Sequence, residues 1–339
     1  MDYIVFKNEN ALYYECNYSC DNAIFLKLGN DAYFITDGRY KIDAKDNIKN
    51  AKVLITNSLL DKLIELLKQN RVKKVMIDPT EWDLLSFEKL KSKVPTKFKL
   101  NPNFSHKKRV IKSEEEIKKL KKAVKIGRNS FKEISFILKN LEGASELELN
   151  FIIESHLRDY GEREISFEPI FAINENAAKP HATPTNKRLK EGDLILFDAG
   201  VKYKRYCSDR TRTAIYNEEL KFIYKQKFSS KKIQKAYDTV LKAHDRAIKK
   251  ARSGMKAKQI DKIARDVIQK AGFGKYFVHS TGHGVGLDIH EMPYISSRSN
   301  TIIEDGMVYT IEPGIYIEGE FGIRIEDMVV MKNGRASIL

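Results

Sequence analysis

The residues of this chain that could do chemistry gather in two acidic hairpins, the first within residues 194–213. An apolar strand leads into a basic and aromatic turn, and a second strand follows. Folding the segment about the midpoint between Tyr203 and Lys204 places Asp198 opposite Asp209, with Cβ atoms about 4.5–5.5 Å apart. Two carboxylates at this spacing repel each other, and a buried unpaired charge is costly. The pattern therefore predicts a metal ion between them, and the alternative is a loop with two solvated aspartates.

Neighbouring arginines do not supply the missing positive charge. Arg210 alternates to the opposite face of its strand, and Arg212 does so too if the strand stays regular. We therefore expect Arg212 to brace the hairpin rather than to balance the two aspartates.

A second acidic hairpin lies near the C-terminus. Glu312 and Glu326 are placed symmetrically about Gly319, in the string TIEPGIYIEGEFGIRIED. The Pro313-Gly314 pair predicts a bulge in this hairpin, because proline cannot donate to the ladder. If the two hairpins face each other, four carboxylates come together, and two divalent cations would balance their charge.

The histidine-rich segment 279–291, HSTGHGVGLDIHE, supplies a nitrogen ligand. Glycines on both sides of His283 let the backbone approach closely and leave the imidazole accessible. Four carboxylates and one imidazole suit Mn²⁺ first, with Co²⁺, Fe²⁺ and Zn²⁺ as alternatives. The predicted ligands of two divalent ions are Asp198, Asp209, His283, Glu312 and Glu326.

Amphipathic helices surround both hairpins in the same order. A capping box at Ser113–Glu116 predicts the start of a long helix, and a second helix is expected from about Glu146 to Tyr160. After the first hairpin, a long apolar stripe up to Gly254 and a shorter helix up to Gly272 repeat this arrangement. The matched order of elements predicts an internal duplication, with pseudo-two-fold symmetry.

The first hundred residues are expected to form a separate small α/β domain. Its strands are predicted at 23–28, 32–36, 53–55 and 72–77, and its helices at 59–67 and 84–93. No residue in it suggests chemistry. The polar stretch 101–109 marks the expected boundary, which gives an N-terminal domain of residues 1–108 and a catalytic domain of residues 109–339.

Bulk properties limit the class of protein. The 339 residues carry a formal charge of +15, but lysines alternate with glutamates through nearly every predicted helix and no nucleic-acid motif accompanies them. We therefore expect no nucleic-acid partner. Without a long apolar run or a signal-peptide pattern, the chain is predicted to be cytoplasmic and to have no membrane partner. The three cysteines are expected to be free thiols.

Five separated motifs resemble those of the "pita-bread" metallopeptidases of family M24, and within them the Xaa-Pro group of aminopeptidase P and prolidase. The motifs are FDAG, SDRTRT, HSTGHGVGLDIHE, TIEPGIY and GIRIED, and KPHATPT around His181 matches as well. FITDGRY at residues 34–40 resembles the creatinase-type N-terminal domain of that family, less specifically. The resemblance implies an α+β protein, with a duplicated pita-bread domain after a small α/β domain, and a homodimer.

The resemblance also implies an activity. A hydroxide bridging two divalent ions would attack the carbonyl group before proline in a peptide whose second residue is proline, so the chain would be a metallo-exopeptidase. The position of His290 would contact the substrate, and that of His181 would serve proton transfer. His279 is a further candidate, Glu312 would combine ligand and proton carrier, and Arg324 would orient a glutamate or the substrate. The alternative for Arg324 is a surface ion pair.

Several activities remain within this resemblance. Xaa-Pro aminopeptidase is the first expectation, and Xaa-Pro dipeptidase (prolidase) is the main alternative because the two share these motifs. Methionine aminopeptidase usually lacks the N-terminal domain, and creatinase lacks this ligand set. A peptide-binding module without catalysis would be expected to have lost ligands that this chain keeps.

Overall fold

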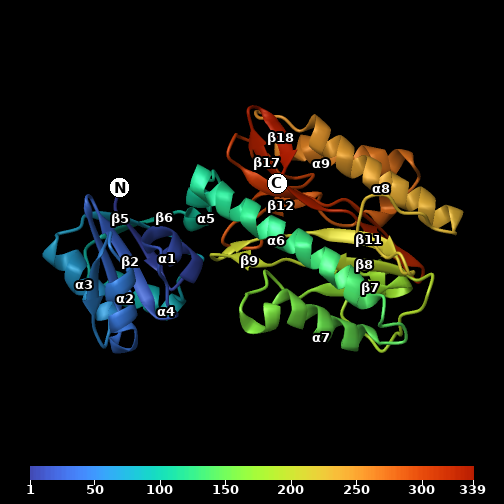
Figure 1. Ribbon diagram of the computed structural model, residues 1–339. Coiled ribbons are helices and arrows are strands. Elements are labelled where there is room, and N and C mark those ends of the chain that lie inside the picture. Colours follow the sequence, from blue (N-terminus) through green and yellow to red (C-terminus); the bar gives the residue numbers. More distant parts are fainter. The chain divides into compact units, whose positions relative to one another are not determined.

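The computed structural model describes residues 1–339, and the chain divides into two compact units, Met1–Arg109 and Val110–Leu339 (Figure 1). Each unit has hydrophobic clusters of its own. No helix in either is long and apolar enough to cross a membrane.

The first unit is built on one six-stranded mixed sheet in the order β4-β3-β2-β1-β5-β6. Its strands are β1 (Tyr3–Phe6), β2 (Ala23–Leu28), β3 (Asp31–Thr36), β4 (Lys52–Ile55), β5 (Lys74–Ile77) and β6 (Lys97–Leu100). Its helices are α1 (Glu9–Cys16), the 3-10 helix η1 (Gly38–Tyr40), α2 (Lys41–Asn47), α3 (Leu59–Gln69), α4 (Leu84–Lys93) and α5 (Phe104–Arg109). Side chains alternate between two clusters, one on each face: Ile4 and Phe6 join one, and Val5 joins the other.

The second unit contains two larger sheets and two short hairpin pairs. The larger sheets have the orders β11-β8-β7 and β13-β12-β14-β17-β18, and the pairs are β9-β10 and β15-β16. The strands are β7 (Ile170–Ile173), β8 (Leu194–Asp198), β9 (Lys202–Tyr203), β10 (Tyr206–Cys207), β11 (Thr211–Ile215), β12 (Gly282–Gly284), β13 (Glu291–Ile295), β14 (Val308–Ile311), β15 (Gly314–Ile317), β16 (Phe321–Arg324), β17 (Asp327–Lys332) and β18 (Arg335–Ile338). The helices are α6 (Glu114–Leu138), α7 (Glu146–Leu157), η2 (Asp159–Gly161), η3 (Asn174–Ala178), α8 (Lys231–Lys250), α9 (Ala257–Lys270) and η4 (Gly274–Tyr276).

The internal duplication is confirmed by element order and by matching hydrogen bonds. Each half presents a long helix and a shorter one, α6 and α7 or α8 and α9, followed by strands in the orders β7-β8-β11 and β12-β14-β17. The amide of Gly143 donates to the carbonyl of Leu189, and the amide of Gly254 donates to that of Ile303 in the same way. The capping box at Ser113 is also present. The expected α+β fold, with a duplicated second unit, is therefore observed.

The register expected for the first acidic hairpin is wrong. Lys204 and Arg205 both adopt left-handed backbone conformations and form a two-residue turn, so Tyr203 pairs with Tyr206. The turn thus lies one residue later than expected, and Asp198 pairs with Thr211. Turns of this kind usually contain Asn or Gly, and the basic pair gives no such signal. Asp209 lies in a break between β10 and β11.

The register expected for the second hairpin is correct on both sides of its interruption. Gly314 pairs with Arg324 in one segment of the ladder and Ile311 pairs with Asp327 in the other. Both pairs are symmetrical about Gly319. The ladder opens around Pro313 but does not shift, so the predicted bulge is absent and the proline interrupts the pairing without inserting a residue.

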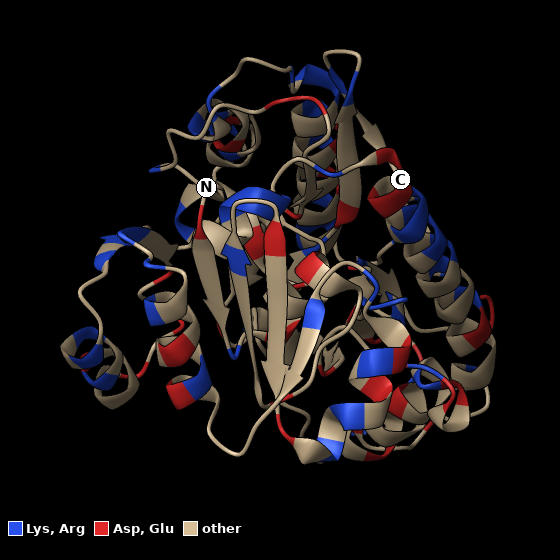
Figure 2. Cartoon of the chain, turned by 90° about the vertical axis from the view of Figure 1, so that its left-hand side faces the viewer, with Lys and Arg blue, Asp and Glu red and all other residues tan.

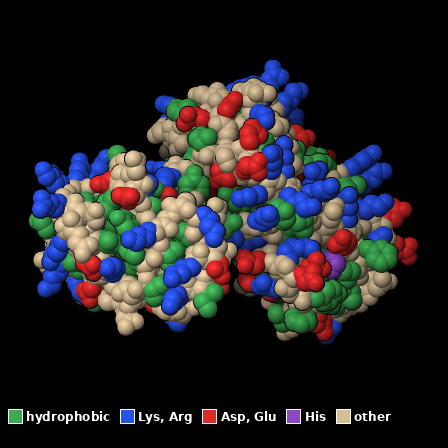
Figure 3. All heavy atoms as spheres, turned by 60° about the vertical axis from the view of Figure 1, so that its left-hand side comes forward, with side chains coloured by type: hydrophobic (Ala, Val, Ile, Leu, Met, Phe, Trp, Pro, Cys, Tyr) green, Lys and Arg blue, Asp and Glu red, His purple; other side chains and the backbone are tan.

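Charged side chains are distributed as expected for a lysine-rich solvated surface. Figure 2 shows Lys and Arg recurring along the helices with Asp and Glu between them. Figure 3 shows the same mixture over one face of the molecule, where basic side chains are spread widely and acidic ones lie among them.

Candidate active site

A cavity of about 670 Å³ in the second unit gathers every predicted site residue. It lies where the strands of the two acidic hairpins meet the glycine-rich strand β12 and the loop that follows β7 and η3. The predicted residues in its wall are His181, Asp198, Asp209, His279, His283, His290, Glu312, Arg324 and Glu326. Segments more than 140 residues apart in sequence therefore contribute to one site.

Three of the predicted ligands are close enough to hold one ion. Oxygen or nitrogen atoms of Asp209, His283 and Glu326 all lie within 4.8 Å of one another, and all three residues are buried. His283 Nε2 is 3.6 Å from Asp209 Oδ2 and 3.4 Å from Glu312 Oε1. Asp198 lies on the same cavity wall. Four carboxylates and an imidazole thus face a common space.

Two of these carboxylates, those of Asp198 and Glu326, each have one buried oxygen without a hydrogen-bond partner, which suits a cation. Thr211 Oγ1 donates to Glu326 Oε2 at 2.6 Å, while Glu326 Oε1 is buried without a hydrogen-bond partner. Arg324 Nη2 donates to Asp198 Oδ2 at 2.6 Å, while Asp198 Oδ1 is likewise buried and unpartnered. One oxygen of each group is fixed by the protein, and the other is left for a ligand. Because buried polar atoms are normally paired, these residues fit divalent ions.

The protonation equilibria of the site reflect the same crowding of negative charge. Burial raises the pKa of Asp209 well above its usual range, and the charges of Asp198 and Glu312 raise it further. Burial and the neighbouring carboxylate of Asp209 raise the pKa of Glu326, and burial also raises that of Glu312. A divalent cation would reverse these shifts by favouring the ionised forms.

The backbone around His283 sets the orientation of its imidazole. Nδ1 donates to the carbonyl of Gly284 at 3.1 Å, so the neutral ring presents an unprotonated Nε2 to the carboxylates. Burial lowers the pKa of His283, which keeps the ring neutral. The flanking glycines are required by close approach: a Cβ at Gly282 would lie 2.0 Å from the carbonyl oxygen of Thr310, and one at Gly284 would lie 2.1 Å from that of Met292.

Arg324 is a buried residue of the site rather than a surface residue. It is 4% exposed and donates to Asp198, to Thr211 Oγ1 at 3.0 Å and to Tyr316 Oη at 2.8 Å. Burial disfavours its charge, but Tyr316 and Asp198 raise its pKa above the ordinary value. The alternative of a surface ion pair is therefore excluded by the geometry.

Tyr316 and Thr211 are two site residues that the sequence did not reveal. Tyr316 Oη donates to His279 Nε2 at 2.8 Å, since His279 Nδ1 donates to the carbonyl of Ser280. Both nitrogens of His279 are therefore engaged within the protein. Tyr316 packs against Gly314, where an added Cβ would lie 2.5 Å from Tyr316 Oη. The glycine two residues before the tyrosine was therefore the one sequence feature that could have indicated its position.

His181 and His290 differ from His279 because their side chains are exposed at the cavity. The His290 ring packs edge-on against that of His283, with centroids 4.3 Å apart, and burial of part of the ring lowers its pKa. Glu146 supports the loop of His181: its buried carboxylate accepts from the amides of Ile173 and Thr185.

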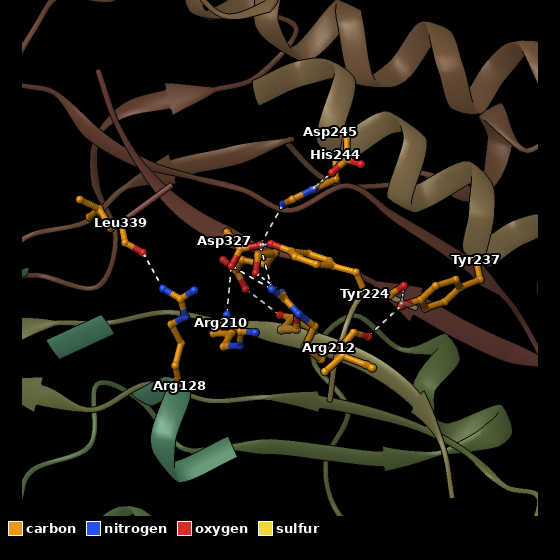
Figure 4. A network of polar contacts seen from close by, with 12 residues as sticks. Arg128, Arg210, Arg212, Tyr224, Tyr237, His244, Asp245, Asp327 and Leu339 are labelled. Carbon is orange, nitrogen blue, oxygen red and sulfur yellow. Dashed lines mark hydrogen bonds and ion pairs between the residues drawn. The ribbon is translucent and has the colours of Figure 1, made fainter. Parts of the chain in front are cut away.

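A second polar network, drawn in Figure 4, lies beside the site and centres on the buried carboxylate of Asp327. Arg212 Nη2 contacts both oxygens of Asp327 at 2.9 Å, and Arg210 Nη1 contacts Oδ1 at 3.1 Å. Tyr224 Oη donates to Oδ2 at 2.6 Å, and His244 Nε2 lies 3.2 Å from the same oxygen. Both arginines point away from the four carboxylates, as the alternation of side chains indicated.

This network fixes the backbone that carries a predicted ligand. Arg212 Nη1 donates to the carbonyl of Glu326 at 2.5 Å, and the amide of Glu326 donates to the carbonyl of Thr211 at 3.1 Å. Arg212 therefore joins the two hairpins, as a brace.

Comparison with known proteins identifies the family of this chain. The model of metallopeptidase family M24 matches residues 118–333, so the chain belongs to the M24 metallopeptidases. Membership implies divalent metal ions, for which Asp209, His283 and Glu326 form a candidate site.

Among curated proteins, the chain is 42% identical over 231 residues to an uncharacterized peptidase of Staphylococcus aureus (strain USA300). The match covers 68% of this chain and 62% of that relative. It is 44% identical over 227 residues to an uncharacterized peptidase of Staphylococcus epidermidis (strain ATCC 12228), covering 67% of this chain and 61% of the relative. The matched region thus spans less than two thirds of either relative's length.

Solved structures match nearly the whole chain. The Xaa-Pro dipeptidase from Bacillus anthracis has a TM-score of 0.90 and 31% identity, covering 99% of this chain and 92% of that one. The X-Pro aminopeptidase from Thermotoga maritima MSB8 has a TM-score of 0.88 and 31% identity, covering 99% and 94%. The prolidase from Pyrococcus furiosus has a TM-score of 0.85 and 32% identity, covering 99% and 95%.

Proposed function

We propose that this metallopeptidase hydrolyses the bond before proline at the N-terminus of peptides, as an Xaa-Pro aminopeptidase. The observation that carries the proposal is the gathering of all the predicted ligands, histidines and Arg324 in one cavity. Similarity to solved Xaa-Pro peptidases at 31–32% identity over 99% of the chain supports it.

The proposed metal ligands are Asp198, Asp209, His283, Glu312 and Glu326, with manganese as the native metal at two sites. When bound, such ions lower the pKa of water and polarise a carbonyl group. Neighbouring side chains orient two of these ligands: Thr211 donates to one oxygen of Glu326, and Arg324 donates to one oxygen of Asp198.

Proton transfer is assigned to the exposed histidines. Proline nitrogen leaves as a secondary amine and must gain a proton, for which His181 and His290 line the cavity with accessible rings. Glu312 is proposed as a proton carrier in addition to its role as a ligand, because its carboxylate lies in the wall of the same cavity as His181 and His290. His279 has both nitrogens engaged, so we assign it to holding Tyr316 in place.

Xaa-Pro dipeptidase activity is the second candidate, because the similar structures include both a dipeptidase, with a TM-score of 0.90, and an aminopeptidase, with a TM-score of 0.88. The two differ in whether residues beyond proline are accepted. We further propose that the chain forms a homodimer and acts in the cytoplasm on peptides with proline as the second residue.

Hydrolysis of Ala-Pro-Ala, Ala-Pro and Ala-Ala-Ala by the manganese-loaded protein tests the proposal, with release of N-terminal alanine as the readout. Preference for Ala-Pro-Ala supports the aminopeptidase, and cleavage of Ala-Pro alone supports the dipeptidase. Equal cleavage of Ala-Ala-Ala would contradict the requirement for proline. No cleavage of any peptide, with two ions bound, would overturn the peptidase proposal.

A further inference from the structure

A second large cavity, separate from the site described above, is lined by basic and aromatic side chains. Its volume is about 860 Å³, within the range of about 300–1,000 Å³ that is usual for small-molecule sites. One wall is a face of α6 and the other is formed by Arg210 and the segment after β11. Its lining residues are Lys125, Arg128, Asn129, Phe131, Lys132, Ser135, Phe136, Lys139, Arg210, Leu220, Lys221, Phe222 and Ile223.

The charge of this lining is one-sided. Six of its residues are Lys or Arg and none is Asp or Glu, although the chain as a whole has 46 acidic residues beside 61 basic ones. On the face of the molecule drawn in Figure 3, basic and acidic side chains are mixed. Like charges converging on one cavity repel each other, and a multivalent anion would relieve that repulsion.

Arg210 contributes a largely buried guanidinium group to the wall of this cavity. Its side chain is 16% exposed, and its Nη1 is bound to Asp327, but Nε is buried without a hydrogen-bond partner. In Figure 4, Arg128 from α6 and Arg210 lie near each other at the edge of the Asp327 network. Arg128 Nη1 donates to the carbonyl oxygen of Leu339 at 3.2 Å. The planar guanidinium groups of these two arginines are of the kind that binds phosphate oxygens in proteins.

The cavity also offers an apolar surface beside the cations. Phe136 is 71% exposed on the same face of α6, and Ile223 is 48% exposed on the opposite wall. Lys125 and Lys132 lie on α6 and Lys139 is its C-cap residue, so the three lysines follow at intervals of seven residues, about 10 Å apart along the helix axis. An aromatic base and a chain of phosphates would match this combination of an apolar surface and cations in kind.

We propose that this cavity binds a nucleoside di- or triphosphate, with the phosphates held by the lysines of α6 and by Arg210, and with the base on Phe136. The site is independent of the peptidase site, because no residue lines both cavities.

Isothermal titration calorimetry of the full-length, manganese-loaded protein tests the proposal, with ATP in excess Mg²⁺, adenosine and tripolyphosphate as probes. We expect ATP to bind at least tenfold more tightly than adenosine and more tightly than tripolyphosphate. The double substitution Lys125→Glu/Lys132→Glu should weaken ATP binding at least tenfold, since both lysines are exposed and their replacement leaves the core intact.

The matched control is Lys258→Glu/Lys270→Glu on α9, which changes the net charge equally and touches no lining residue of this cavity. It should bind ATP as the unmodified protein does. Equal ATP affinity in both double variants would overturn the proposal, as would an absence of ATP binding. Tighter binding of an oligoglutamate peptide than of ATP would overturn the assigned ligand class. Circular dichroism verifies that each variant is folded.

Discussion

Thr211 lies between an acidic and a basic side chain of the site, those of Glu326 and Arg324. Its hydroxyl group donates to Glu326 Oε2 and accepts from Arg324 Nε. A single small side chain thus orients a predicted metal ligand and the buried arginine together. Hydrogen bonds of this kind commonly govern metal affinity, because they fix the direction of the ligand's lone pairs.

We predict that Thr211→Val weakens manganese binding about 10–100-fold while the protein stays folded. The methyl group keeps the volume but removes the hydroxyl contact. Thr213→Val is the matched control, since Thr213 lies on the same strand and contacts only the backbone of Arg324. Equilibrium dialysis with metal analysis measures both. Equal affinities in the two variants would refute the role of Thr211.

Tyr316 allows a second prediction about a single hydroxyl group. Tyr316→Phe removes the donor to His279 and the acceptor for Arg324, so we expect kcat to fall about tenfold, equivalent to about 1.4 kcal/mol, with metal content unchanged. Tyr309→Phe serves as control, because the Tyr309 hydroxyl is buried and has no partner. Steady-state kinetics on Ala-Pro-Ala compares them. A loss of bound metal in Tyr316→Phe would show a different role.

The sequence revealed the cavity residues whose types are uncommon on strands or in buried sites. It did not reveal Thr211 and Tyr316, whose types are common there. Carboxylates on strands and a histidine between glycines are conspicuous because strands and buried sites disfavour them. Thr211 and Tyr316 are common strand residues, and their roles depend on contacts across 115 and 37 residues of sequence, respectively. Such contacts follow from the tertiary fold and leave no local pattern.

At the scale of elements, strand register was predictable where a turn had the expected residues. The second hairpin turns about Gly319, which has a positive φ of 71°, and its register was predicted correctly. The first turns at Lys204 and Arg205, for which positive φ is unusual, and the prediction failed there. The aspartates nevertheless reach one cavity, because the error of two residues keeps the alternation of faces.

The Asp327 network joins these hairpins, and its removal should affect the whole second unit. Asp327→Ala leaves the buried guanidinium of Arg212 without its partner, and we expect a loss of about 3–5 kcal/mol in the free energy of unfolding. The control is Asp245→Ala, whose side chain is 65% exposed and contacts His244 alone; about 1 kcal/mol or less is expected. Urea unfolding followed by circular dichroism distinguishes the two. A similar small loss in both would show that the network is not a brace.

At the scale of the whole molecule, the only tryptophan reports on one unit. Trp82 stacks on Phe6 in the first unit, with ring centroids 4.0 Å apart. Its fluorescence therefore follows unfolding of residues 1–109, and ellipticity follows both units. The two units can be examined separately in the intact chain.

The free energy of unfolding of the first unit should fall as the pH rises above 4.5, the ordinary pKa of a glutamate. The pKa of Glu81 is raised from 4.5 to about 7, mainly by burial and also by the charge of Asp78, against the opposing effect of the donors Ser105 and Asn8. A raised pKa in the folded state stabilises the unit below pH 4.5, and this contribution is lost as the pH rises to about 7.

Glu81→Gln should remove this loss, because glutamine stays neutral. Relative to the variant, the unmodified protein should lose about 1–3 kcal/mol between pH 4.5 and pH 7. Trp82 fluorescence in urea measures the difference, with Glu88→Gln, at an exposed site, as control. Parallel pH profiles for the unmodified protein and Glu81→Gln would contradict the prediction.

Metal loading should affect the second unit selectively, because all the predicted ligands belong to it. An ion that binds only the folded state stabilises it by about 2.7 kcal/mol at a concentration one hundred times its Kd. Four crowded carboxylates also repel each other less once cations are bound. We therefore expect manganese to raise the melting temperature seen by ellipticity by several degrees and chelation to reverse it, while the Trp82 transition stays unchanged. Equal shifts of both signals would mean that the units unfold together, and no shift in either would argue against the metal site itself.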